Sequence, residues 1–138
     1  MQPPDPEFVA ETRAWLVKAE RDLRAAALLA AAEPGFAGDA LFHCQQAAEK
    51  ALKAFLTWHG QTFRKTHNIG ELGQAVADLA PELASLMREG ARLTDYAWKF
   101  RYPGEEAEPE PGETGAALDL ARRFFQAIAT RLPAEARP

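Results

Sequence analysis

β-branched residues are scarce in this sequence: valine, isoleucine and threonine together supply only 12 of its 138 residues. Alanine and leucine, in contrast, supply 29 and 15. Branched side chains lose rotamer freedom in a helix, whereas alanine and leucine lose little. The composition therefore predicts an all-α protein, and the length fits one domain, residues 1–138, built around one hydrophobic core.

Cysteine and long apolar runs are also nearly absent. Cys44 is the single cysteine, so an intrachain disulfide is excluded. The longest purely apolar run has eight residues, 25–32, which is far too short to span a bilayer. Residues 1–5 lack the basic and apolar segments of a secretory signal. Since a lone thiol also suits a reducing compartment, we expect a cytoplasmic protein without membrane association.

The residues that build metal and cofactor sites do not occur at the required spacing. His43, His59 and His67 form no metal-ligand pattern with Cys44 or with a carboxylate. Cys44 lies on an alanine-rich helix face, where a buried, inert thiol is expected. A glycine-rich phosphate loop of the Walker type is missing. We therefore predict neither a metal nor a cofactor, and we assign no catalytic residue.

Apolar residues recur at spacings of three and four in five segments, which is the pattern of amphipathic helices. Asp5, Asn68 and Thr114 stand at the positions of helix caps. The predicted helices cover about 7–32, about 39–59, a segment from about 68, a segment from 81 to about 100, and a segment from 114. Short connections favour antiparallel neighbours, so we predict a four- or five-helix up-and-down bundle. Its core spans about 7–132, with an acidic loop at 103–113 and a frayed tail at 133–138.

The second predicted helix carries an unusual mixture of residues on one face. At about 100° per residue, Gln45, Gln46, Glu49 and Lys53 fall within about a third of its circumference. Apolar Phe42 and Leu56 accompany them, which is uncommon on a plain solvated surface. Two interpretations stay open at this point. The face is either a solvated charge stripe, or a binding site or interhelical polar network.

Asp22 lies beside the apolar face of the first predicted helix. A carboxylate at such a boundary usually needs a partner, and Lys50 or Lys53 is the candidate. We therefore expect a polar network that includes Asp22, Gln46 and Glu49. A structural ion pair is the alternative to a functional role, because such pairs also perturb ionisable groups without serving function.

The net charge of -4 argues against general affinity for nucleic-acid backbones, but it leaves room for a local basic site. Arg64, Lys65 and His67 precede the third predicted helix, whose free N–H groups and positive dipole end favour a phosphate. Arg101 and Tyr102 end the fourth, and an aromatic beside an arginine can stack on a base. The alternatives are a solvated loop and a cation that merely suits a helix C-terminus. The candidate phosphate-binding residues are Arg64, His67, Arg101, Tyr102, Lys50 and Lys53.

Four stretches carry a resemblance to a known family: residues 15–29, residues 42–53 with Gln-Gln-Ala-Ala-Glu-Lys-Ala-Leu-Lys, residues 66–72 with His-Asn-Ile, and Arg-Tyr-Pro at 101–103. In this order and spacing they resemble the HEPN family (higher eukaryote and prokaryote nucleotide-binding), over roughly residues 15–128. The resemblance implies an up-and-down helical bundle that is often dimeric. It also implies a minimal nucleotidyltransferase as partner, in some cases as a toxin–antitoxin pair.

Many HEPN proteins are metal-independent ribonucleases with an arginine, four to six further residues and then a histidine near the end of a late helix. Here no histidine follows Arg101. The resemblance therefore implies a nucleotide- or RNA-associated binding module more than an enzyme. The alternatives are a purely structural, dimerising bundle and, less favoured, a metal-independent ribonuclease. The alanine-rich stripe and Trp15, Trp58 and Trp98 also lead us to expect a homodimer.

Overall fold

The computed structural model describes residues 5–32, 35–104 and 108–138, and in these residues every regular element is a helix. The α-helices are α1 Pro6–Ala31, α2 Ala37–Trp58, α3 Ile69–Leu79, α4 Ala84–Gly90 and α5 Glu113–Ala129. Three short 3₁₀ helices join them: η1 Pro81–Leu83, η2 Ala91–Ala97 and η3 Ala134–Ala136. The predicted all-α bundle is confirmed. No helix of this described part is long and apolar enough to cross a membrane.

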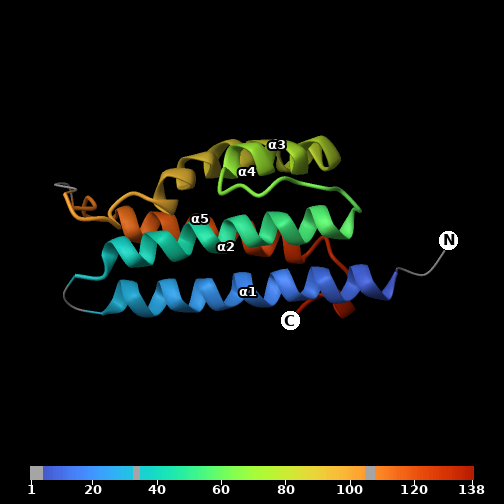
Figure 1. The fold of residues 1–138 in the computed structure, drawn as a ribbon, viewed down its shortest axis with the longest axis horizontal. Coiled ribbons are helices and arrows are strands. Elements are labelled where there is room, and N and C mark those ends of the chain that lie inside the picture. Colours follow the sequence, from blue (N-terminus) through green and yellow to red (C-terminus); the bar gives the residue numbers. More distant parts are fainter. Residues whose placement is uncertain (1–4, 33–34, 105–107) are drawn as a thin grey trace.

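The bundle is organised around α2, which packs against α1, α3, α5 and η2. Figure 1 shows α1 running alongside α2, with α3 and α4 on the opposite side of α2 from α1. Small residues let these neighbours approach closely, because Ala47, Ala48, Ala51 and Ala54 are all fully buried. Seven consecutive residues of α2, 51–57, are buried. The helix that carries the polar residues of interest is therefore enclosed for much of its length.

Two helix starts follow the predicted capping chemistry. The carboxylate of Asp5 accepts a hydrogen bond from the backbone N–H of Glu7 at 2.8 Å, and Pro6 is the first residue of α1. The side-chain oxygen of Asn68 accepts from the N–H of Glu71 at 3.1 Å. The start of α3 thereby fixes the end of the connector that leads to it from α2.

The cap predicted for the last helix was wrong. Thr114 lies inside the first turn of α5, which begins at Glu113 after the left-handed Gly112. The carboxylate of Glu113 accepts from the Tyr96 hydroxyl at 2.6 Å and from the Glu110 N–H at 2.8 Å. These two contacts anchor the first residue of α5 without a threonine cap.

The segment predicted as one helix from 81 to about 100 is divided into η1, α4 and η2. The change from α4 to η2 occurs at Gly90, where the aromatic ring of Phe124 occupies the space of a Cβ atom. After η2 the chain turns through Phe100, which has a left-handed φ of 67°. This turn brings Phe100 against Gly38, whose added Cβ would lie 2.9 Å from the Phe100 Cβ.

The tail predicted to be frayed is docked on the bundle. Residues Ala134–Ala136 form η3, Ala136 is fully buried, and the Arg137 guanidinium donates to the Leu132 carbonyl at 2.7 and 2.9 Å. The element packs against α1, which supplies the burial that a loose tail lacks. Of the predicted acidic loop, residues 105–107 lie outside the described part of the chain, as do residues 1–4 and 33–34.

Candidate functional site

The polar face of α2 is not a solvated stripe, so that interpretation was wrong. Gln45 is fully buried, and Glu49 and Lys53 are only 3% and 8% exposed. They lie under the connector between α2 and α3, which covers this side of α2, whereas Phe42, Gln46 and Lys50 on the neighbouring side of the helix stay partly exposed. A buried polar group is costly unless it has partners, and each of these three has them.

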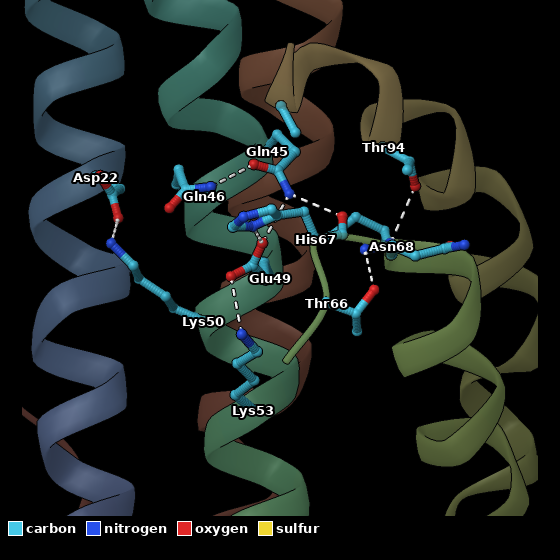
Figure 2. Close-up of polar contacts among 12 residues, drawn as sticks. Asp22, Gln45, Gln46, Glu49, Lys50, Lys53, Thr66, His67, Asn68 and Thr94 are labelled. Carbon is cyan, nitrogen blue, oxygen red and sulfur yellow. Dashed lines mark hydrogen bonds and ion pairs between the residues drawn. The ribbon is translucent and has the colours of Figure 1, made fainter. Parts of the chain in front are cut away.

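Glu49 is the centre of one group of contacts, drawn in Figure 2. Its Oε1 accepts from the Gln45 side-chain amide at 3.0 Å and lies 2.7 Å from Nδ1 of His67. Its Oε2 accepts from Nζ of Lys53 at 3.0 Å. The Gln45 amide also donates to the backbone carbonyl of His67 at 3.0 Å, and its own oxygen accepts from Gln46 at 2.6 Å. The α2–α3 connector is thus held to α2 through both the backbone and the ring of His67.

Asp22 is the centre of a second group, which joins α1 to α2. Nζ of Lys50 lies 2.6 Å from Oδ2 of Asp22, and Nδ1 of His43 lies 2.8 Å from Oδ1. Lys50 therefore supplies the partner that the sequence analysis left open between two lysines. His43 was missed, although it stands seven residues before Lys50 and so shares its side of the helix.

Lys53 points into the protein. Its Nζ lies 5.4 Å from the Trp15 ring centroid and 5.8 Å from that of Phe63, and the two rings contact each other edge to face. Aromatic faces attract an ammonium, and the Glu49 carboxylate neutralises its charge. This candidate phosphate ligand is therefore already engaged by an aromatic pair and a carboxylate.

Arg64 lies in the connector before α3, and its side chain contacts Glu71 in the first turn of that helix. Its guanidinium forms a two-pronged ion pair with Glu71, with N···O distances of 2.7 and 3.1 Å. This hydrogen-bonded arginine holds the pKa of the Glu71 carboxyl below its ordinary value. Both side chains are well exposed, so water competes with the pair.

Arg101 lies at the other end of the polar face. Its guanidinium carbon sits 3.8 Å above the centroid of the Phe42 ring, and Nη1 donates to the Ala97 carbonyl at 3.0 Å. The Tyr102 ring is 5.8 Å away. Eleven residues of α2 separate Phe42 from Lys53, which is about 16 Å at about 1.5 Å per residue. The structure thus does not bring the six candidate residues together: Arg101, with Tyr102 beside it, lies over Phe42, Lys53 lies about three turns further along α2, and Arg64 is paired with Glu71 of α3.

The described residues contain no group of three or more histidine, cysteine, aspartate or glutamate side chains that could hold a metal ion. Cys44 is buried, and desolvation raises the pKa of its thiol to about 12 although Arg122 acts in the opposite direction. What the geometry offers is a row of half-exposed groups along α2, with Arg101 above Phe42 at one end and His67 at the side.

Comparison with the profiles of known families shows which family this chain belongs to. The profile of one family, described as the HEPN domain, matches residues 12–132, which is most of the sequence. The chain belongs to the HEPN domain family. No curated protein and no solved structure matches it.

Within this HEPN domain, both carboxylate-centred groups lie inside the matched region. The Gln-Gln-Ala-Ala-Glu-Lys-Ala-Leu-Lys block occupies the middle of α2, where its alanines pack inward and its polar residues join α1 and the α2–α3 connector. His-Asn-Ile forms the start of α3, and Arg-Tyr-Pro follows η2 and the left-handed Phe100. Three of the four stretches that suggested the family, residues 42–53, 66–72 and 101–103, therefore lie on or against α2.

Proposed function

We propose that this HEPN domain is a nucleotide- or RNA-associated binding module that acts with a minimal nucleotidyltransferase, as one half of a toxin–antitoxin type pair. Family membership supports a nucleotide- or RNA-related role. The observation that carries the proposal to particular residues is the Arg101 guanidinium, exposed and stacked 3.8 Å above the Phe42 ring.

A guanidinium stacked on an aromatic ring is a flat, charged surface that suits a nucleobase or a phosphate. Arginine also matches phosphate geometry with paired N–H donors. His67, whose side chain is 68% exposed, and the half-exposed Lys50 lie along the same face of α2. In a protein of net charge -4, an anionic ligand requires a local group of basic side chains such as this one.

The contacts also rank the candidate residues. Lys53 is buried between two rings, and Arg64 is paired with Glu71 at the start of α3. We assign the ligand contacts chiefly to Arg101, Tyr102 and His67, which are exposed on or beside this face of α2, and place Lys50, which is paired with Asp22, beside them. Arg64 is the control position: it is basic and exposed, but its guanidinium is paired with Glu71 of α3 and is not stacked on Phe42.

The experiment is a titration of ATP and of a short single-stranded RNA into the wild-type protein and two variants. We expect Arg101→Ala to weaken binding and Arg64→Ala to leave it nearly unchanged. Binding should also weaken with added salt, because charge contacts are screened. Equal affinity in wild type and Arg101→Ala would remove this arginine from the site. Absence of any binding would leave the assembly role as the better description.

A second candidate function, a homodimer that acts in assembly, is favoured by the exposed aromatics. Trp98 and Tyr102 are 54% and 59% exposed, and large apolar groups outside a core often mark contact surfaces. We propose an isologous dimer, since such closed interfaces are the commonest in homo-oligomers. Light scattering at micromolar concentration should give twice the monomer mass. A monomer mass would contradict the dimer without affecting the ligand titration.

A further inference from the structure

Two histidines of this HEPN domain are held in the same way by buried carboxylates. Nδ1 of His43 lies 2.8 Å from Asp22, and Nδ1 of His67 lies 2.7 Å from Glu49. Each carboxylate also binds one lysine, Lys50 in the first case and Lys53 in the second. The arrangement is therefore repeated, with a carboxylate, an imidazole and an ammonium in each group.

Burial is divided unequally within each group. The side chains of Asp22 and Glu49 are only 11% and 4% exposed, whereas those of His43 and His67 are 30% and 68% exposed. A hydrogen bond from Nδ1 to a carboxylate fixes the ring orientation and directs Nε2 away from it. Both imidazoles are thus oriented from inside the protein while part of each ring faces solvent.

Gln46 stands between the two groups. His43, Gln46 and Glu49 follow one another at intervals of three, so Gln46 is midway between the other two in both angle and height on α2. His43 contacts Asp22 of α1 on one side. On the other side His67 reaches Glu49 from the connector, as Figure 2 shows. Gln46 is itself only partly buried, and its amide donates to Gln45.

A purely structural tether does not account for the ring of His67. Its backbone carbonyl already accepts from Gln45, which holds the connector in place. The Glu49 carboxylate is also satisfied without the ring, because Gln45 and Lys53 donate to its two oxygens. A further carboxylate contact on a ring that stays 68% exposed orients an imidazole toward solvent.

We infer that His43 and His67 are ligand-contacting residues, which bind a phosphodiester of the RNA through Nε2 on either side of Gln46. This inference rests on the proposed function and extends it to residues beyond Arg101. Asp22 and Glu49 are positioning residues, since they act through the imidazoles. An imidazolium has two N–H donors, so Nδ1–H can donate to the carboxylate while Nε2–H donates to a phosphate oxygen, and in each group the carboxylate and the lysine offset each other's charge.

The test uses a single-stranded RNA of about 10 nucleotides, within the usual length range of single-strand sites. His43→Ala and His67→Ala should each weaken binding by about tenfold, the effect of one lost charge-assisted contact. His59→Ala is the matched control, because His59 is an exposed histidine at the C-terminal cap of the same helix. It removes the same side chain outside the proposed site and should leave the affinity unchanged.

Imidazole ¹⁵N resonances of the wild-type protein give a second readout. Addition of RNA should shift Nε2 of His43 and His67 and leave that of His59 in place. Glu49→Gln should change the distribution of the proton between the two nitrogens of His67, which loss of stability alone does not do. Thermal melts ensure that all variants are compared while folded.

The outcomes separate the two proposals. RNA that binds wild type, His43→Ala, His67→Ala and His59→Ala with equal affinity would overturn the inference and leave the proposed function standing. Weakening by His59→Ala to the same extent would also overturn it, since the effect would then not be local. Failure of wild type to bind RNA would overturn the proposed function and this inference with it.

Discussion

Lys50 of α2 reaches across to α1, where its ammonium lies 2.6 Å from the carboxylate of Asp22. Asp22 is 8% exposed and also contacts Nδ1 of His43 at 2.8 Å. The Asp22–Lys50 ion pair therefore joins the two longest helices, α1 and α2. Replacement of Asp22 by a neutral residue leaves the Lys50 ammonium without its carboxylate at a partly buried position. Loss of an ion pair lowers stability more at a buried position than at an exposed one.

We predict that Asp22→Ala lowers the free energy of unfolding by about 2 to 3 kcal/mol. The effect should fall short of a fully buried pair because Lys50 keeps 23% of its side chain exposed and can recover some water. Urea unfolding followed by circular dichroism measures it. As a control, Arg123→Ala breaks the exposed Arg123–Glu89 pair and should have almost no effect. Equal losses in the two variants would contradict the assignment.

Much of the fold could be predicted from the sequence because it depends on local signals. Helix positions follow from apolar spacing, and Asp5 and Asn68 act as caps where the sequence places them. Long-range packing is what escaped prediction. Apolar spacing on α5 predicts Phe125 on the inner face, and this prediction was wrong: Phe124 is the fully buried ring, because it packs into the space beside Gly90 of another helix.

In the candidate site, too, local contacts could be predicted from the sequence and long-range packing could not. The partnership of Asp22 with a lysine of α2 could be anticipated, because both lie at helix positions that face a neighbour. Whether Glu49 is solvated or buried could not, since this depends on the connector that crosses it. The stack of Arg101 on Phe42 depends on the left-handed Phe100, and no local pattern predicts that conformation for a phenylalanine.

Gly90 and Phe124 provide a prediction about packing. A Cβ at position 90 would overlap the Phe124 ring, and that ring is fully buried. We therefore expect Gly90→Ala to destabilise the protein by about 1 to 3 kcal/mol, as overpacked cores do. The smaller side chain of Phe124→Leu should partly restore the stability of Gly90→Ala in a double-mutant cycle.

Gly115 is the matched control for this substitution. It is an exposed glycine of α5 with no atom within 4 Å of an added Cβ. Gly115→Ala should stabilise the protein by about 0.5 to 1 kcal/mol, because alanine loses less backbone entropy in a helix. Chemical denaturation of both variants gives the comparison. Destabilisation of similar size at both positions would show that the ring contact is not the cause.

Cys44 should be unreactive while the protein is folded. The thiolate is the nucleophile, and burial raises the pKa of this thiol to about 12, so little thiolate exists near pH 8. We expect Ellman's reagent to label the native protein far more slowly than the urea-unfolded protein, in which one thiol should react at once. Rapid labelling of the native form would mean that the α2 core opens readily around Cys44.

The last prediction concerns catalysis by the isolated protein. Catalytic members of the family that this chain resembles use an arginine followed by a histidine, and here no histidine follows Arg101. In the described structure, the guanidinium of Arg101 lies on Phe42, and His43 and His67 are held at Nδ1 by Asp22 and Glu49, where we infer that they bind phosphate oxygens and not the 2′-hydroxyl or the leaving oxygen of a cleavage reaction. General acid–base cleavage needs a proton-transfer group within hydrogen-bond reach of the reacting atoms. We therefore predict that the protein does not cleave a structured RNA in EDTA, where only metal-independent activity remains. Denaturing gels over a long incubation test this. Cleavage by wild type that disappears in Arg101→Ala would show that this arginine has found another proton-transfer partner, and His67→Ala would then identify whether that partner is His67.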